Sequence, residues 1–296
     1  MFQKTCFIVI LGLTFLTACQ GTLQSTTNTP AAPAASLAET LTSNERARNY
    51  LLHVPPSYRS DKPSPLVIDF HGYGSSPNDE EILTGMSVKA DESGFIVAYP
   101  DGLDSAWQVG PGSGGEADLQ FIRDLITSIE KKYNIDTKRV YATGISNGGG
   151  MVNWVGCNLA DMVAAIAPDS GGYNFWQDCH PSRPVPVLAF HGLDDHIIPY
   201  SGDTPEAASP PIEVWASAWA ERNGCSTSPS VTTPVDTVTV QTWSNCINNA
   251  DVILYTLANH GHSWPGSATG VAYETTSQAV RATDLIWDFF KVHPMP

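Results

Sequence analysis

Short apolar runs alternate with helix-like stretches along most of the chain. The apolar runs end at or near Gly, Pro and Asp, as strands buried in a parallel sheet do. These runs predict seven strands, at residues 50–54, 66–70, 95–99, 140–143, 163–167, 187–190 and 252–256. Helices are predicted at residues 119–133, 147–157, 213–223 and 277–292, and the last of these has its apolar residues at helical spacing.

This alternation predicts the fold class. Strands that alternate with helices form βαβ units, so we expect an α/β fold with a doubly wound, mostly parallel sheet and helices on both of its faces. Functional sites in such sheets lie at the carboxyl ends of the strands. The residues that directly follow the predicted strands are therefore the candidates for chemistry.

The first 18 residues predict a cleaved leader and a secreted protein. Lys4 precedes an apolar run at residues 6–16, which has the length of a signal-peptide core and is too short to span a bilayer with margin. Residues 16–19 (LTAC) resemble the bacterial lipobox, so we expect cleavage before Cys19 and acylation of its thiol, which would anchor the protein to the membrane of a bacterial cell envelope. The alternative is an ordinary signal peptide cleaved at the same bond, with Cys19 as an incidental thiol.

A change of composition separates this leader from the rest of the chain. Residues 19–42 are rich in Thr, Ala, Pro, Ser and Asn and contain almost no large apolar residue, so we expect a flexible tether. A random coil of roughly 20 residues spans about 25 Å. Residues 43–296 are then expected to form one domain, since α/β domains of this length are routine.

The cysteines predict two disulfides. Without Cys6 in the leader and Cys19 on lipid, four remain, and an even number in an oxidising compartment favours disulfides. Among three possible connectivities we prefer the pairing of neighbours in sequence, which joins Cys157 to Cys179 and Cys225 to Cys246. The four cysteines have no CxxC spacing and no nearby paired histidines, so no metal site is predicted.

The charge balance excludes one class of partner. Acidic residues outnumber basic ones by 30 to 15, and the basic residues are scattered along the chain. Nucleic acid would be repelled from most of such a surface, so we expect no nucleic-acid partner.

A GxSxG motif lies between the strand predicted at residues 140–143 and the helix predicted at 147–157. It consists of Gly144, Ser146 and Gly148, and it predicts a nucleophile elbow in which the two glycines remove side chains that would collide in the tight turn. The amino end of the following helix favours the oxyanion that forms when the serine attacks a carbonyl. The alternative is a Gly-rich turn with a capping serine.

A serine nucleophile needs a base, which in this kind of fold comes last in chain order. His260 and His262 follow the last predicted strand. We favour His262, because Gly261 gives the backbone freedom to aim it while Trp264 and Pro265 fix the loop. His260 is the fallback.

The acid and the oxyanion hole are expected on two further loops. Asp194 and Asp195 both follow the strand at residues 187–190, and either could orient the imidazole, so chemistry alone does not separate them. His71 and Tyr73 follow the strand at 66–70. The backbone N–H groups of Tyr73 and Asn147 are the predicted oxyanion hole, whereas His71 precedes the elbow and is expected to hold its loop.

Six stretches together resemble the feruloyl esterase and polyhydroxybutyrate depolymerase family of secreted α/β-hydrolases. In that family the acid is the aspartate four residues after the His of a His-Gly pair, which falls on Asp195, and the base is the histidine two before Trp-Pro, which falls on His262. Leu193 and Asn259 depart from the family pattern on loops that line the pocket. The matching stretches are residues 50–55, 71–74, 94–102, 139–149, 191–200 and 262–266.

The resemblance implies a serine carboxylic-ester hydrolase with an α/β-hydrolase fold and no cofactor. Its expected activity is feruloyl esterase-like, the release of hydroxycinnamic acids from plant polysaccharide esters through an acyl-enzyme on Ser146. Trp107, Trp176 and Trp264 are candidates for stacking on an aromatic acyl group or a sugar. For these residues the alternative is packing in the core or a lid, which is slightly favoured for Trp107 and Trp176. The alternatives are a 3-hydroxyalkanoate depolymerase, an acetyl xylan esterase, a peptidase with the same triad, or a carbohydrate-binding lipoprotein without turnover.

Overall fold

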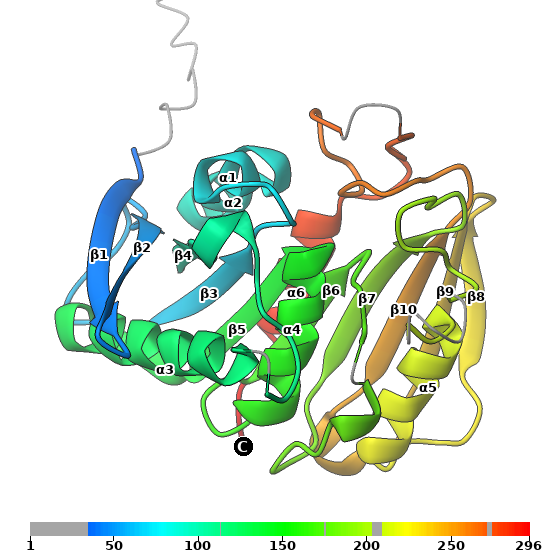
Figure 1. The fold of residues 1–296 in the computed structure, drawn as a ribbon. Coiled ribbons are helices and arrows are strands. Elements are labelled where there is room, and N and C mark those ends of the chain that lie inside the picture. Colours follow the sequence, from blue (N-terminus) through cyan, green and yellow to red (C-terminus); the bar gives the residue numbers. More distant parts are fainter. Residues whose placement is uncertain (1–34, 113, 175, 203–208, 271–273) are drawn as a thin grey trace, which may run out of the picture. The chain divides into compact units, whose positions relative to one another are not determined.

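The computed structural model describes residues 35–296 except residues 113, 175, 203–208 and 271–273 and the side chain of Trp176. Within these residues ten strands form one sheet in the order β1-β2-β4-β3-β5-β6-β7-β10-β9-β8, with β1 and β8 at opposite edges (Figure 1). The strands are β1 (Leu37–Ser43), β2 (Arg46–His53), β3 (Ser64–Phe70), β4 (Ile96–Pro100), β5 (Ile135–Ile145), β6 (Ala165–Asp169), β7 (Val187–Gly192), β8 (Ser230–Val235), β9 (Val238–Trp243) and β10 (Val252–Leu257).

The centre of the sheet is parallel and its edges are antiparallel. Parallel pairs join β4 to β3, β3 to β5, β5 to β6, β6 to β7 and β7 to β10. Antiparallel pairs add β2 and β1 on one side and β9 and β8 on the other. The centre of the sheet is thus parallel, as predicted, although the predicted strand at 50–54 belongs to the antiparallel β2.

Helices cover both faces of the sheet. Along β3 the buried side chains of Leu66, Ile68 and Phe70 pack on one face, in a core cluster that includes residues of α3, α4 and α5, whereas Val67 packs on the other with residues of α2 and α6. The helices are α1 (Pro77–Thr84), α2 (Met86–Ser93), α3 (Gly115–Lys132), α4 (Asn147–Asn158), α5 (Ile212–Arg222) and α6 (Ala282–Phe290).

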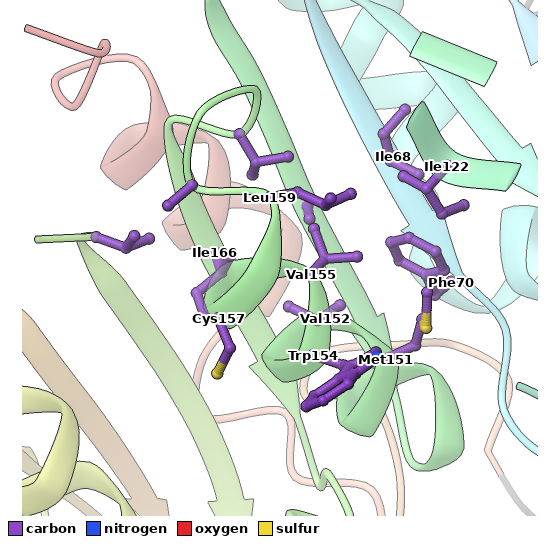
Figure 2. Close-up of a cluster of buried hydrophobic side chains, with 14 of the residues drawn as sticks. Ile68, Phe70, Ile122, Met151, Val152, Trp154, Val155, Cys157, Leu159 and Ile166 are labelled. Atoms are coloured by element: carbon purple, nitrogen blue, oxygen red, sulfur yellow. The ribbon is translucent and has the colours of Figure 1, made fainter. Parts of the chain in front are cut away.

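The helix that follows the GxSxG motif is held by the larger of these clusters. Met151, Val152 and Val155 of α4 are fully buried, and Figure 2 shows them among side chains of β3, α3 and β6. Burial of each such side chain contributes about 1.5–3 kcal/mol. Because α4 begins directly after Ser146, this packing fixes the position of the motif relative to the sheet.

Three strands and two short helices were not predicted. Strand β8 is exposed along its whole length, and β1 alternates between exposed and half-buried positions, so neither has an apolar run. Strand β9 was also missed. Helices α1 and α2 have eight residues each and are largely polar. Strands β1 and β8 and helices α1 and α2 carry little apolar periodicity, the signal from which the other elements were predicted, whereas β9 (VTVQTW) does begin with alternating apolar and polar residues.

The tether boundary at residue 42 is wrong. Residues 37–43 form β1, which pairs with β2 from Leu37 opposite Leu52 to Ser43 opposite Arg46. Pairing with a neighbouring strand satisfies the backbone of this polar segment, so composition alone was misleading. The predicted leader and Cys19 lie outside the described residues.

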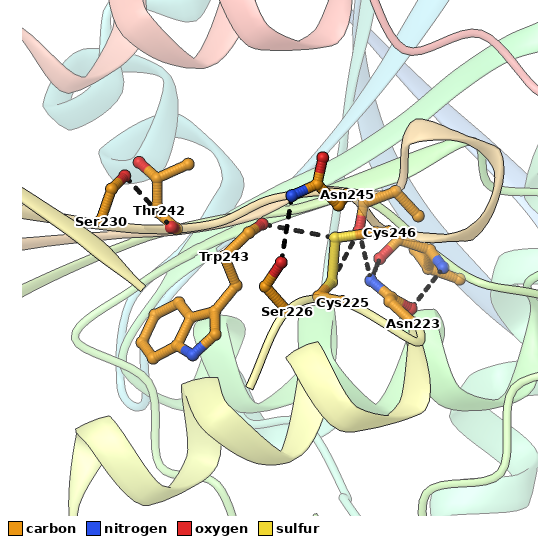
Figure 3. Close-up of a disulfide and its surroundings, with 10 residues drawn as sticks. Asn223, Cys225, Ser226, Ser230, Thr242, Trp243, Asn245 and Cys246 are labelled. Carbon is orange, nitrogen blue, oxygen red and sulfur yellow. Dashed lines mark hydrogen bonds between the residues drawn. A yellow bond between two sulfur atoms is a disulfide. The ribbon is translucent and has the colours of Figure 1, made fainter. Parts of the chain in front are cut away.

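Both predicted disulfides are present. Cys157 at the end of α4 is bonded to Cys179, and Cys225 after α5 is bonded to Cys246 after β9 (Figure 3). The partners are 22 and 21 residues apart. Loops of this length stabilise the folded state by roughly 3 kcal/mol each, because the bond restricts the unfolded chain.

Candidate active site

Ser146 occupies a strained turn between β5 and α4. Its backbone has φ 59° and ψ −122°, which is rare for a residue with a side chain, and its N–H donates to Asp169 O at 3.0 Å. A Cβ atom would lie 2.4 Å from Phe70 O at Gly144 and 2.0 Å from the same oxygen at Gly148. Only glycine fits at either position, so the motif has the packing of a nucleophile elbow.

Asp195, and not Asp194, is bonded to the candidate base. Asp195 Oδ2 accepts a hydrogen bond from His262 Nδ1 at 2.9 Å, and its Oδ1 accepts the N–H groups of Ile197 and Ile198 at 2.9 and 2.8 Å. Asp194 is exposed, and its backbone N–H donates to His260 O. Burial alone would raise the pKa of Asp195, but the hydrogen bonds from His262 and Ile198 and the His262 charge hold it below its ordinary value.

His262 and His260 differ in what their rings bind. His260 Nε2 donates to Ser263 O at 2.9 Å, and its Nδ1 accepts the N–H of Ser277 at 2.9 Å, so both ring nitrogens are used within the loop. Burial lowers the pKa of His260, which keeps its ring neutral. The ring of His262 donates from Nδ1 to Asp195, which leaves Nε2 for a second partner.

A third histidine, His191, lies close to the candidate acid Asp195. His191 Nε2 donates to Ile198 O at 2.8 Å and is 3.4 Å from Asp195 Oδ2. Burial lowers the pKa of His191 to about 4, so this ring is neutral. His191 lies at the start of the loop that carries Asp195, and the amide of Ile198, later in that loop, donates to Asp195. The hydrogen bond from His191 to Ile198 O therefore joins two ends of this loop.

The three candidate side chains follow β5, β7 and β10, which end at the same edge of the parallel sheet. Asp195 and His262 are in contact, whereas no hydrogen bond joins the Ser146 hydroxyl to His262 in the part of the chain that the structure describes. Catalytic hydrogen bonds are often long without substrate and tighten in the complex. The geometry is thus compatible with a triad that closes on substrate.

The loop after β3 lies against the nucleophile. A Cβ atom at Gly72 would be 3.4 Å from Ser146 Cβ, which places the neighbouring Tyr73 beside the elbow. Asn147 is the first residue of α4, where backbone N–H groups have no partner within the helix. Its side chain binds Trp107 twice, accepting from N at 2.7 Å and donating to O at 3.1 Å, which anchors the next loop beside the elbow.

His71 holds this loop, as predicted. Its Nδ1 donates to Gly72 O at 2.8 Å and its Nε2 accepts the N–H of Gly102 at 2.9 Å, which joins the loops after β3 and β4. Burial lowers the pKa of His71, so a neutral ring with this fixed tautomer is favoured.

The predicted roles of Trp107 and Trp264 in substrate binding are wrong. Only 3% and 1% of these residues are exposed. Trp107 Nε1 donates to His71 O at 3.0 Å, and Trp264 Nε1 donates to Thr283 Oγ1 at 2.9 Å, so both indoles belong to the core beneath the loops. The side chain of Trp176 lies outside the described residues.

Other apolar side chains are exposed at this edge of the sheet. Tyr73 follows β3 and is 78% exposed, Leu103 follows β4, and Leu193 and Ile197 follow β7. We call these four residues the apolar rim. Only the backbone N–H of Tyr73 was assigned a role from the sequence, although an aromatic residue shortly after a predicted strand was a usable signal.

A buried pair of carboxyl groups lies at the same end of β3. Asp69 precedes Phe70, is fully buried, and accepts a hydrogen bond from Thr84 Oγ1 at 2.8 Å. Burial raises the pKa of Asp69 to about 7, and burial together with Asp69 raises the pKa of Glu80 well above its ordinary value. The pair therefore retains a proton near neutral pH.

The His, Cys, Asp and Glu side chains of the described residues form no group of three or more that could hold a metal ion. Among the same residues, none of the helices has both the length and the apolar character needed to cross a membrane.

Part of the chain matches a known family model, and most of it aligns with named esterases. Residues 48–181 match the family model Esterase PHB depolymerase. The chain is 32% identical to feruloyl esterase B of Piromyces equi over 84% of this chain and 46% of that protein. It is 31% identical to the bifunctional acetylxylan esterase/xylanase XynS20E of Neocallimastix patriciarum over 69% of this chain and 29% of that protein. The chain thus spans less than half the length of either relative.

The solved acetyl xylan esterase from Aspergillus awamori has the same fold. It superposes with a TM-score of 0.65 over 87% of this chain and 99% of that chain, at 16% sequence identity. Together with the sheet order and the helices on both faces, this match shows that the chain has the α/β-hydrolase fold.

Proposed function

We propose that the chain is a serine carboxylic-ester hydrolase, and the match of residues 48–181 to the family model Esterase PHB depolymerase supports this proposal. Ser146 is the nucleophile, His262 the base and Asp195 the acid of its triad. The observation that carries the proposal is the 2.9 Å hydrogen bond between His262 and a buried Asp195 at the edge of the sheet where the strained Ser146 lies.

The proposed reaction is acyl transfer in two steps. Ser146 Oγ attacks the ester carbonyl while its proton passes to His262 Nε2, and the imidazolium is stabilised by Asp195. The backbone N–H groups of Tyr73 and Asn147 donate to the oxyanion. His262 then gives its proton to the leaving alcohol, and a water molecule repeats the sequence to release the acid and restore Ser146.

We propose hydroxycinnamoyl esters of plant polysaccharides as the substrates. The name of the Piromyces equi relative supports a feruloyl ester. The apolar rim supports it independently, because Tyr73 directly follows Gly72, which lies against Ser146, and its exposed phenol ring would offer a flat surface to an aromatic acyl group. We therefore assign contact with the acyl group to the apolar rim and not to the buried Trp107 and Trp264.

Acetylated xylan and 3-hydroxyalkanoate esters are the second candidates. The Neocallimastix patriciarum relative is named an acetylxylan esterase, and the matched family model is named for a depolymerase. Both substrates would use the same triad with a smaller or aliphatic acyl group. Product analysis separates them from a feruloyl ester.

We propose that the protein acts outside the cytoplasm. Its two disulfides support an oxidising compartment. Attachment to a bacterial membrane by lipid on Cys19 remains a proposal from the sequence at residues 16–19. A Cys19→Ser variant that stays with the membrane fraction would contradict the anchor.

The proposed function is tested with the chain from Cys19 to Pro296 and its Ser146→Ala variant. Methyl ferulate, acetylated xylan and 3-hydroxybutyrate oligomers are supplied separately, with and without a chelator. We expect ferulate release that disappears in the variant and does not respond to the chelator. Cleavage of only the oligomers or only acetylated xylan would move the substrate assignment, and equal activity of both chains would overturn the mechanism.

A further inference from the structure

Residues 274–277, which we call the brace, run alongside the loop that carries His262. Each of the four brace residues binds one of residues 260–263 of the loop, and side-chain and main-chain groups alternate along the brace. The contacts are Gly261 N–H to Thr275 O at 2.9 Å, Ser277 N–H to His260 Nδ1 at 2.9 Å, Ser263 Oγ with Thr276 Oγ1 at 2.6 Å, and His262 N–H to Glu274 Oε2 at 3.1 Å.

Glu274 is the brace residue that binds the base itself. Its carboxylate accepts the backbone N–H of His262, and only 11% of its side chain is exposed. A Cβ atom at Gly261 would lie 1.8 Å from Glu274 Oε2. Gly261 is therefore required for close approach of this carboxylate, a steric reason in addition to the backbone freedom expected from sequence.

Carboxylates face His262 from two elements. Asp195, after β7, binds the ring at Nδ1, and Glu274 binds the backbone. The other titratable neighbours are His260 and His191, which burial keeps neutral. His196 is 82% exposed, and its Nδ1 is 3.9 Å from Glu274 Oε1. Glu274 is thus a largely buried carboxylate whose Oε2 accepts the backbone N–H of His262, the proposed base.

We propose that Glu274 is a positioning residue for the proposed esterase reaction. By holding the backbone of His262, it keeps the ring in place for the Asp195 hydrogen bond while Nε2 receives the Ser146 proton. Its negative charge also favours the imidazolium that exists between the two proton transfers. Glu274 exchanges no proton with the substrate. The inference rests on the triad proposed above.

Two variants separate the hydrogen bond from general structure. In Glu274→Ala the acceptor is lost, and we expect kcat to fall about 10- to 100-fold while KM stays within about twofold. In Glu274→Gln the amide oxygen can still accept the His262 N–H, so we expect rescue to within about threefold of wild type, the remainder reflecting the lost charge. Active sites are counted with a fluorophosphonate probe, so that only folded, competent enzyme enters kcat.

The matched control is Asp194→Asn. This exposed carboxylate is close to the acid in sequence but its side chain does not bind the loop of His262, and we expect kcat within about twofold of wild type. The inference is overturned if Glu274→Ala keeps the wild-type kcat, loses activity only through KM or the count of active sites, or is not rescued by Gln. Failure of the triad itself is distinct, because it appears as retained activity in Ser146→Ala.

Discussion

His262 Nδ1 donates to Asp195 Oδ2 at 2.9 Å, across 67 residues of sequence. The bond fixes the tautomer of the imidazole, because a carboxylate only accepts, and so presents Nε2 as the acceptor for a serine proton. The backbone N–H groups of Ile197 and Ile198 donate to Asp195 Oδ1, so the carboxylate is held in its orientation independently of His262.

Asp195→Asn should therefore lower kcat by about 10³- to 10⁴-fold with little change in KM, because the amide no longer holds this tautomer or stabilises the imidazolium. Steady-state kinetics on methyl ferulate measures this loss. The matched variant is Asp194→Asn, which removes an exposed carboxylate one residue earlier. A large loss in Asp194→Asn with near-normal Asp195→Asn would reverse the assignment of the acid.

Gly148→Ala should destabilise the fold as well as abolish activity. The new Cβ would lie 2.0 Å from Phe70 O, so the elbow or β3 must shift, at a cost of roughly 1–3 kcal/mol in the free energy of unfolding. Chemical denaturation provides the measurement. Gly172→Ala is the control, since its Cβ would meet only Ile198 Cδ1 at 3.7 Å, and equal stability of the two variants would argue against a crowded elbow.

The buried carboxyl group of Asp69 should cause the free energy of unfolding to fall as pH rises from about 4 to about 7. Burial raises its pKa to about 7 in the folded protein, above the ordinary value of about 3.9, so the folded state holds a proton that the unfolded chain releases. This contribution is complete below about pH 4 and is lost as pH rises to about 7. Urea unfolding across this range should show a flatter profile for Asp69→Asn, and parallel profiles would contradict the prediction.

Tyr73→Ala should change substrate preference while leaving the oxyanion hole intact, because alanine keeps the backbone N–H. Loss of the exposed ring should lower kcat/KM on methyl ferulate by about 3- to 10-fold, as expected for one aromatic contact, and leave a short acetyl ester nearly unaffected. The ratio of the two kcat/KM values is the readout. An equal loss on both esters would show that the ring acts on the elbow and not on the acyl group.

The sequence was informative wherever a local signal carries the structure. The apolar runs predicted β3 to β7 because buried parallel strands must be apolar, and GxSxG predicted the elbow because glycine is required on both sides of Ser146. The disulfides followed from an even count and the nearest pairing. The same reasoning missed β1 and β8, whose polar residues are stabilised by pairing at the sheet edges.

Other features depend on tertiary contacts that no local pattern reports. Trp107 and Trp264 follow predicted strands as ligand-binding aromatics would, yet packing places both indoles in the core. Asp194 and Asp195 are adjacent and chemically alike, so residue chemistry did not separate them; the family resemblance favoured Asp195, and the fold shows that Asp195 contacts His262. Glu274 lies 12 residues beyond His262 in no motif, so its contact with the base could not be anticipated.

The central claim is that Ser146 carries the acyl group during turnover. Mass spectrometry of the protein quenched in acid during hydrolysis of a feruloyl ester tests it most directly. We predict a feruloyl adduct on the peptide that contains Ser146, absent in Ser146→Ala and formed far more slowly in His262→Ala. Ferulate release at full rate by Ser146→Ala, or an adduct on a different residue that forms and decays at the rate of turnover, would contradict the account.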